Sequence, residues 1–280
     1  MAIRVAMIGF GEAALAFAPG LSASLAAFDI RPDRPVVANV QSMASCEEAL
    51  AGAGAALSLV TADQALQAVT DAAGYLEPGA LWFDMNSVAP DTKRAANHVI
   101  EAAGGRYVDV AVMAPVHPAL IGVPLLVSGP HAEEGATLLR AIGFTRVRII
   151  AGPVGRASAI KMIRSVMVKG IEALSAECVL AADRAGVLDE VIASLDASPQ
   201  PADWTSRADY NLDRMLEHGL RRAAEMEEVV KTLDALGTGS AMTRGTVVRQ
   251  REIGALGATS PEGLGAKLAL LDPNRKAQAA

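Results

Sequence analysis

Cysteine, aromatic residues and basic runs are all scarce in this chain of 280 residues. Its two cysteines, Cys46 and Cys178, are too few for a disulfide framework or a metal-binding set, and they fit a reducing compartment. The formal net charge is −6, and no stretch is rich in lysine or arginine. Because nucleic-acid-binding proteins normally carry a cluster of basic residues, we expect no nucleic-acid partner. The small number of cysteines also leads us to expect no metal site.

Long uninterrupted hydrophobic runs are missing as well, although two segments come close. Residues 1–25 have the composition of a signal peptide, but Glu12 lies inside the apolar run beside Gly9 and Gly11, which a secretory segment rarely tolerates. Residues 110–130 carry no charged side chain, yet four prolines would break a membrane-spanning helix there: Pro115, Pro118, Pro124 and Pro130. We therefore expect a cytoplasmic protein that has no membrane partner.

The remaining composition is that of a globular protein, with 51% hydrophobic and 20% charged residues. The first half of the chain alternates short apolar runs with helical runs, which is typical of a mainly parallel sheet covered by helices on both faces. Strands are predicted at residues 3–8, 25–28, 57–60, 81–83, 107–110, 124–127 and 147–150. Helices are predicted at residues 46–50, after a capping box of Ser45 and Glu48, and at 64–73 and 132–141.

Strand signals nearly vanish in the second half of the chain. Residues 157–185 contain no proline and a single glycine, Gly170, which predicts one helix of roughly 40 Å. A further helix is predicted at residues 212–236, ended by Gly237, and residues 238–272 are expected to be helical with glycine interruptions. The chain therefore divides near residue 152.

A glycine-rich turn follows the first predicted strand directly and opens a helix. Residues 9–14 read G-F-G-E-A-A and match the pattern G-x-G-x-x-A. The first glycine permits the tight turn, the second lets a pyrophosphate approach the backbone, and the alanine lets the helix pack closely on the sheet. The alternative is a glycine-rich turn without a ligand. We predict a dinucleotide site with cofactor contacts at Gly9, Phe10, Gly11, Glu12 and Ala13.

Asp29 lies directly after the second predicted strand, 20 residues after Gly9. A carboxylate at this place accepts hydrogen bonds from the adenosine ribose hydroxyls and repels a 2′-phosphate, so Asp29 favours NAD as the cofactor. Arg31 and Arg34 are close enough in sequence to attract such a phosphate, and they leave NADP open.

Three further stretches follow the glycine turn in order. Residues 83–90 read F-D-M-N-S-V-A-P, residues 108–115 read V-D-V-A-V-M-A-P, and residues 152–155 read G-P-V-G with Lys161 six residues later. Together with the glycine turn, they resemble the D-x-S-T-x-x-P segment, the D-A-P-V-S-G-G substrate loop and the G-x-x-x-x-x-K helix start of the β-hydroxyacid dehydrogenase superfamily. That superfamily includes 3-hydroxyisobutyrate dehydrogenase and 6-phosphogluconate dehydrogenase. The chain resembles in particular the branch with a phosphogluconate-dehydrogenase-like C-terminal domain.

The resemblance implies a Rossmann-type NAD(P)-binding domain over residues 1–152 and an all-helical substrate and dimerisation domain over residues 153–280, joined by a long interdomain helix. It implies that Lys161 is the general acid/base, which takes the hydroxyl proton while hydride leaves for the nicotinamide. It also places Thr61, Ala62 and Asn86 beside the cofactor.

Departures from the family pattern concern the substrate. The loop has Met113, Ala114 and Pro115 in place of Ser-Gly-Gly, and Ser165 stands where the family has an asparagine. Asp109, at the end of a predicted strand, is expected to have a structural role. Arg222 is interpreted either as a substrate contact or as one member of an ion pair within its own helix. The predicted substrate contacts are Ser87, Met113, Ala114, Pro115, His117, Ser165, Lys169 and Arg222.

Helical periodicity gives a separate interpretation of Lys161. On a helix, Lys161, Ser165, Lys169 and Glu172 lie on one arc, and an amphipathic helix with a solvated face is the plain alternative to a catalytic role. The opposite arc is apolar and consists of Ile160, Ile163, Met167, Ile171, Leu174 and Cys178.

Three functions are consistent with these patterns. The leading hypothesis is an NAD(P)-dependent dehydrogenase of a small hydroxy acid, with a sugar acid included, that forms a homodimer through its helical domain. The second is a reductase of C=N bonds on the same scaffold, against which the presence of Lys161 argues. The third, from a different class, is a cofactor-binding regulatory protein without turnover.

Overall fold

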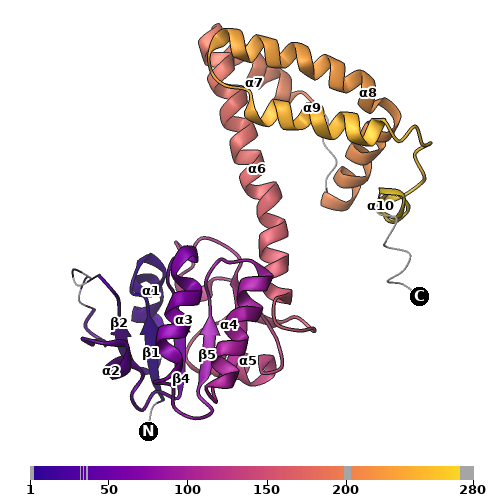
Figure 1. Ribbon diagram of the computed structural model, residues 1–280. Coiled ribbons are helices and arrows are strands. Elements are labelled where there is room, and N and C mark those ends of the chain that lie inside the picture. The colour runs from indigo at the N-terminus through magenta and orange to yellow at the C-terminus, as the bar shows by residue number, and fades with distance from the viewer. Residues whose placement is uncertain (1–2, 32, 34, 36, 199–202, 272–280) are drawn as a thin grey trace. The chain divides into compact units, whose positions relative to one another are not determined.

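The computed structural model describes every residue except 1–2, 32, 34, 36, 199–202 and 272–280, so Arg34 lies outside the described residues. The chain divides into two compact units, residues 1–166 and 167–280. The predicted class is confirmed, because a mainly parallel sheet is followed by helices alone (Figure 1). No helix of the described residues has both the length and the apolar composition that crossing a bilayer requires.

An eight-stranded sheet forms the centre of the first unit, in the order β3-β2-β1-β4-β5-β6-β7-β8. Neighbouring strands are parallel except β6 and β7, which are antiparallel. The strand order changes direction at β1: β2 and β3 lie on one side of it, and β4 and the later strands lie on the other. In a parallel sheet, such a change of direction opens a crevice at the carboxyl ends of the strands. The strands are β1 (Arg4–Ile8), β2 (Ser24–Phe28), β3 (Val40–Ser42), β4 (Ala55–Ser58), β5 (Leu81–Asp84), β6 (Arg106–Val112), β7 (Leu125–Ser128) and β8 (Val147–Ile149).

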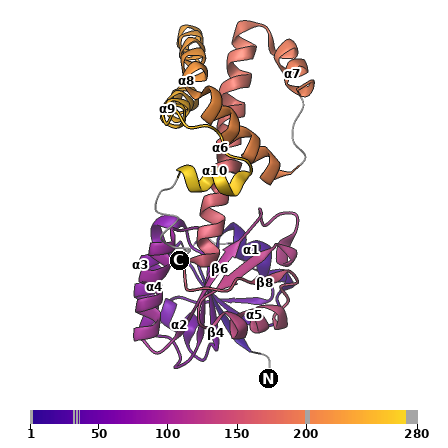
Figure 2. The same cartoon turned by 90° about the vertical axis from the view of Figure 1, so that its right-hand side faces the viewer.

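Helices cover both faces of this sheet (Figure 2). On one face lie α1 (Glu12–Phe17) and α5 (Ala132–Ala141), and on the other lie α2 (Cys46–Leu50), α3 (Ala65–Ala73) and α4 (Pro90–Ala102). Successive residues of β1 alternate between the two apolar clusters, with Val5 and Met7 in one and Ala6 and Ile8 in the other. Because both faces are buried, the strands read as continuous apolar runs rather than as alternating ones.

The structure corrects the bounds of two predicted elements and adds two that were not predicted. The strand predicted at residues 57–60 begins two residues earlier, as β4. The edge strand β3 and the helix α4 were not predicted; β3 has only three residues, and the first turn of α4 is polar. The helix predicted at residues 212–236 begins at Trp204, where the carboxylate of Asp203 caps it by accepting a hydrogen bond from Ser206 N.

Helices alone make up the described part of the second unit. They are the C-terminal part of α6 (Arg156–Ala185), α7 (Leu188–Asp196), α8 (Trp204–Leu236), α9 (Ala241–Gly254) and α10 (Leu264–Leu271). α8 and α9 pack closely where Gly219 faces Gly254, since a Cβ atom on Gly219 would lie 2.8 Å from Gly254 Cα. Glu177 of α6 accepts hydrogen bonds from Met242 N and Thr243 N in the first turn of α9. The buried Lys267 of α10 pairs with Asp209 of α8 at 2.8 Å.

The contact between α8 and α9 gives a first test. In Gly254→Ala, the added methyl group would lie 2.5 Å from Leu220 N, so the helices must separate. We expect a loss of about 1–3 kcal/mol in the free energy of unfolding, measured by urea denaturation. Gly245→Ala is the control on the same helix, because its Cβ meets no atom within 4 Å. It should stabilise the protein by about 0.5–1 kcal/mol. Equal stabilities of the two variants would contradict the close packing of these helices.

Candidate functional site

The glycine turn adopts the conformation that the motif requires. Gly9 has φ of +89°, and a Cβ atom there would lie 2.7 Å from Leu59 O, so only glycine fits. Gly11 precedes α1, and a Cβ atom on it would meet no protein atom within 4 Å. The space in front of Gly11 is therefore open, as a cradle for a pyrophosphate at the helix N-terminus must be.

Asp29 binds the turn from the end of β2. Its Oδ2 accepts a hydrogen bond of 2.7 Å from Phe10 N, and its Oδ1 accepts one of 2.8 Å from Arg31 N. The carboxylate therefore stabilises the glycine turn in addition to facing the place predicted for the adenosine ribose. The side chain of Phe10 is buried in the core and its N–H is bound to Asp29, so Phe10, a predicted cofactor contact, lines neither of the two cavities described below.

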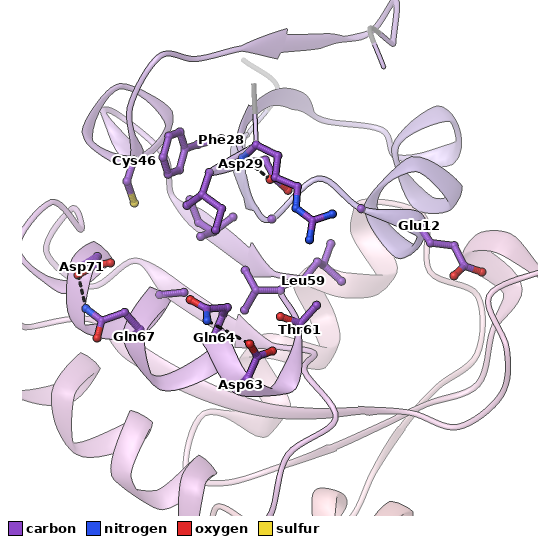
Figure 3. A pocket seen from close by; sticks show the side chains of 17 residues that line it. Glu12, Phe28, Asp29, Cys46, Leu59, Thr61, Asp63, Gln64, Gln67 and Asp71 are labelled. Atoms are coloured by element: carbon purple, nitrogen blue, oxygen red, sulfur yellow. Dashed lines mark hydrogen bonds between the residues drawn. The ribbon is translucent and has the colours of Figure 1, made fainter. Parts of the chain in front are cut away.

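A cavity of about 410 Å³ lies at the carboxyl ends of β1, β2 and β4 (Figure 3). Five of the predicted cofactor contacts line it, namely Gly9, Gly11, Glu12, Asp29 and Thr61. The sequence analysis missed the opposite wall, which α2, α3 and the turn before α3 supply: Cys46, Asp63, Gln64, Gln67 and Asp71. The spacing of Gln64, Gln67 and Asp71 on one helical face after β4 is the signal that could have found part of it.

Cys46 lies in the first turn of α2 on the wall of this cavity (Figure 3). Burial, and secondly the negative charge of Asp71, raise the pKa of its thiol to about 11. The thiol is therefore protonated at neutral pH, so Cys46 is suited to report whether the cavity is filled and not to act as a catalytic nucleophile.

A second cavity, of about 450 Å³, adjoins the first and shares Glu12, Leu59, Val60 and Thr61 with it. The two cavities therefore follow one another along the sheet edge, as the two halves of a dinucleotide require. Ten further residues line the second cavity alone. The predicted ones are Ala13, Ala62, Asn86, Ser87, Ala114, Pro115 and Lys161, and Met85, Val112 and Val116 add apolar surface.

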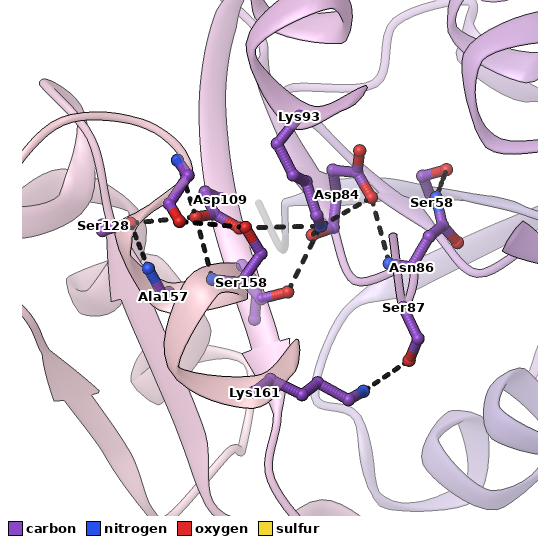
Figure 4. Close-up of polar contacts among 12 residues, drawn as sticks. Ser58, Asp84, Asn86, Ser87, Lys93, Asp109, Ser128, Ala157, Ser158 and Lys161 are labelled. Atoms are coloured by element: carbon purple, nitrogen blue, oxygen red, sulfur yellow. Dashed lines mark hydrogen bonds and ion pairs between the residues drawn. The ribbon is translucent and has the colours of Figure 1, made fainter. Parts of the chain in front are cut away.

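Lys161 lies on the wall of the second cavity, in the second turn of α6. Its Nζ donates a hydrogen bond of 2.5 Å to Ser87 Oγ (Figure 4). Ser87 follows β5, and the neighbouring Asn86 donates from Nδ2 to Ser58 Oγ at 2.9 Å. A lysine ammonium and a hydroxyl thus meet beside the segment that the sequence places near the nicotinamide.

Five predicted substrate residues do not line either cavity. Met113 packs against the apolar cluster of Ala111, Leu126 and Ala157. The hydroxyl of Ser165 donates to the carbonyl of Lys161 one turn earlier, and His117 is exposed. Lys169 and Arg222 belong to the second unit. Among the described residues, no three His, Cys, Asp or Glu side chains gather closely enough to hold a metal ion.

A buried group of charges lies behind Ser87 and Lys161 (Figure 4). Nζ of Lys93, on α4, donates to Asp84 Oδ1 at 2.9 Å and lies 3.6 Å from Asp109 Oδ1. The side chains of all three residues are at most 1% exposed. Tyr107 donates from its hydroxyl to Asp84 Oδ2 at 2.6 Å, and burial followed by the charge of Asp84 raises the pKa of Tyr107 far above its usual value. Sequence reasoning missed Lys93.

Asp109 fixes the start of α6, in agreement with the structural role expected for it. Its Oδ2 accepts hydrogen bonds from Gly155 N at 3.0 Å and Ser158 N at 3.3 Å, at the end of the helix where N–H groups are free. Ser128 Oγ donates to the same carboxylate oxygen and accepts from Ala157 N. The carboxylate thus acts as an N-cap supplied by another strand.

Comparisons with known proteins agree with this geometry. Residues 19–150 match the NAD binding domain of 6-phosphogluconate dehydrogenase, and residues 182–253 match a domain of unknown function, DUF1932. A conserved hypothetical protein from Sinorhizobium meliloti is 36% identical, with 97% of this chain and 96% of that one covered and a TM-score of 0.58. An uncharacterised 28.5 kDa protein of Methanothermus fervidus is 25% identical over 175 residues, which is 62% of this chain and 66% of that protein.

Two further solved structures extend the comparison. One is a conserved protein of unknown function described as structurally similar to 3-hydroxyacid dehydrogenases. It is 27% identical, covers 92% of this chain and 100% of its own, and has a TM-score of 0.56. The other is an imine reductase from Myxococcus stipitatus in complex with NADP⁺. It is 16% identical to this chain, and the match covers 96% of this chain and 100% of the reductase, with a TM-score of 0.75. At this low identity, the similarity shows the fold alone.

The fold and the glycine turn define a nicotinamide-dinucleotide-binding oxidoreductase scaffold. The chain belongs to the β-hydroxyacid dehydrogenase superfamily, in the branch that joins a 6-phosphogluconate dehydrogenase-type NAD-binding domain to a DUF1932 domain. The predicted nicotinamide cofactor is thereby confirmed at the level of the domain.

Cys46 allows the first cavity to be tested directly. Saturating NAD should slow alkylation of Cys46 by about fivefold or more at pH 8.5, where the small thiolate fraction of a thiol with a pKa near 11 still reacts. Raising the pH toward 11 should speed the reaction of the free protein. NADP should protect Cys46 only at higher concentration, because Asp29 faces the same cavity. Cys178, exposed on α6, is the internal control. Alkylation of Cys46 that NAD does not slow would remove the assignment of the cavity.

Proposed function

We propose that the protein is an NAD(P)-dependent oxidoreductase that transfers hydride between its cofactor and a small hydroxy acid, sugar acids included, with Lys161 as the general acid/base. The observation that carries the proposal is the place of Lys161 Nζ. It lies on the wall of a cavity that adjoins the dinucleotide turn, 2.5 Å from Ser87 Oγ. Asp29 favours NAD over NADP as the cofactor.

The chain supplies the proton transfer and the orientation of the substrate. A nicotinamide bound at this sheet edge would supply the acceptor for the hydride that leaves the carbinol carbon. Lys161, as a neutral amine, takes the hydroxyl proton as the C=O bond forms, and returns it to the oxygen in reduction. Ser87 Oγ holds Nζ on one side, and its own hydroxyl proton is free to be donated to the reacting oxygen. Because Lys161 and Ser87 are already in position before the substrate binds, the entropic cost of reaching the transition state is lower.

Recognition of an acidic group needs a second cation besides Lys161. Ala114 and Pro115 occupy the wall where the family pattern has a hydroxyl-bearing and glycine-rich cradle, so this wall offers apolar surface. Lys169 and Arg222, which belong to the second unit, stay predictions from the sequence as cations for a substrate carboxylate or phosphate.

Reduction of a C=N bond is the second candidate, supported by one observation. The apolar wall of Met85, Val112, Ala114, Pro115 and Val116 suits an uncharged imine better than a carboxylate. Lys161 favours the dehydrogenase, since an alcohol needs a proton acceptor at its oxygen. A panel of hydroxy acids, sugar acids and cyclic imines, followed at 340 nm with both nucleotides, separates the two.

Replacing Lys161 tests its role. Lys161→Ala should lower the kcat for the active hydroxy acid by about 10²- to 10⁴-fold, the usual contribution of a general acid/base. NAD binding, measured by calorimetry, should stay within about twofold of the wild type because the side chain is outside the first cavity. Arg164→Ala, an exposed change on the same helix, is the matched control and should keep full activity. Equal kcat values for Lys161→Ala and the wild type would remove the acid/base assignment.

Assembly as a homodimer is part of the proposal. The apolar arc of α6 leaves large side chains in solvent, with Ile163 72%, Met167 46%, Ile171 44% and Leu174 44% exposed. Such a stripe at helical spacing is covered by a partner in most proteins, and a second copy offers the same stripe.

Light scattering tests the dimer. The wild type should show twice the chain mass of 28.9 kDa, because burial of the α6 stripe favours association. Ile171→Glu should shift the protein to the monomer, whereas Val248→Glu, on the exposed side of α9, should not. A monomeric wild type at micromolar concentration would contradict the proposal.

A further inference from the structure

Lys93 has no exposed surface and lines neither cavity, yet its ammonium lies between two carboxylates that lead toward the reaction centre. We propose that Lys93 is a positioning residue that fixes Ser87 and Lys161 relative to each other. The inference rests on the proposed function, in which these two side chains work as a pair. It assigns a role to a residue that does not touch the substrate or the cofactor.

The first connection runs through Asp84 at the end of β5. Lys93 Nζ donates to the backbone oxygen of Asp84 at 2.5 Å and to its Oδ1 at 2.9 Å. The same Oδ1 accepts a hydrogen bond of 3.0 Å from Asn86 N. Ser87 is the next residue, so the position of its hydroxyl depends on a carboxylate that Lys93 holds (Figure 4).

The second connection runs through Asp109 in β6. Lys93 Nζ lies 3.6 Å from Asp109 Oδ1, while Asp109 Oδ2 accepts hydrogen bonds from Gly155 N and Ser158 N. These amides belong to the start of α6, and Lys161 follows Ser158 by three residues, which is less than one turn. The position of Lys161 therefore depends on the second carboxylate beside Lys93.

The ammonium is needed because hydrogen bonds from neutral groups do not neutralise the charge of the two buried carboxylates. Without it, two buried negative charges would face one another across the space that Nζ now fills, and burial makes their repulsion strong. The hydroxyl of Tyr107 donates a hydrogen bond to Asp84 only, and the amides at the start of α6 donate to Asp109 only. Lys93 alone of these groups contacts both carboxylates, so its removal should release the loop and the helix from each other.

The test compares the reactivity of Lys161 in the free protein, which needs no substrate. Acetic anhydride labels lysines at pH 8, and mass spectrometry reads the label on Lys161 and on the exposed Lys169 of the same helix. In Lys93→Met, Lys161 should be labelled about fivefold faster, because an amino group released from its hydrogen bond to Ser87 is more accessible to the reagent. Lys169 should change by less than about 1.5-fold, since no part of this network reaches it.

A matched control separates positioning from loss of stability. Lys267→Met removes another buried lysine that pairs with a carboxylate, Asp209, and it should destabilise the protein without changing the labelling of Lys161. Ser128→Ala is the milder variant, and it removes one of the hydroxyl contacts between Asp109 and the start of α6. It should raise the labelling of Lys161 by a smaller factor, and it decides the question if Lys93→Met does not fold.

Activity measurements then distinguish this inference from the proposed function. With an active substrate, Lys93→Met should lower kcat and shift the pH profile with little change in KM, and it should cost nothing further in a Lys161→Ala background. Labelling of Lys161 that equals the wild type in Lys93→Met and Ser128→Ala would overturn the positioning role while the dehydrogenase assignment stands. Faster labelling in a protein that oxidises no hydroxy acid would support positioning and overturn the proposed function.

Discussion

The ammonium of Lys93, enclosed between the carboxylates of Asp84 and Asp109, is the interaction on which the geometry of the candidate site depends. It joins β5, α4 and β6, which follow one another in the sequence, and through Asp109 it connects them to the start of α6, 46 residues further along the chain. Burying three charges costs solvation, which the hydrogen bonds to Tyr107, to backbone amides and among the three offset. A less specific apolar contact would hold these elements together without defining their separation.

The parts of the fold that sequence reasoning predicted are those with a local cause. The glycine turn was predictable because Gly9 needs a positive φ and Gly11 needs open space in front of it, and both conditions leave a fixed spacing in the sequence. The long helix α6 was predicted to within one residue at its start because no proline or capping signal interrupts it. The strand β4 was displaced because its first residues, Ala55 and Ala56, have little β-propensity and are buried only by their neighbours.

The parts that were not predicted depend on contacts between elements and not on a local sequence pattern. The first turn of α4 is polar and looks like solvent-exposed surface, and only its partners on β5 and β6 make Lys93 a buried residue. Cys46 and Gln67 line the first cavity because α2 and α3 begin at the same sheet edge as the glycine turn. Met113 is the converse case, since a residue that aligns with a substrate loop instead packs with Ala111 and Leu126.

The same arrangement explains how the substrate loop can depart from the family pattern while the lysine is retained. The contact between Lys161 and Ser87 is built from α6 and from the segment after β5, and both are fixed by buried carboxylates rather than by residues 113–115. A change from a glycine-rich cradle to Ala114 and Pro115 therefore alters the wall of the second cavity without moving the two groups that we propose to transfer the proton. In the proposed function, reaction chemistry and substrate choice thus depend on separate contacts, and the first can persist while the second diverges.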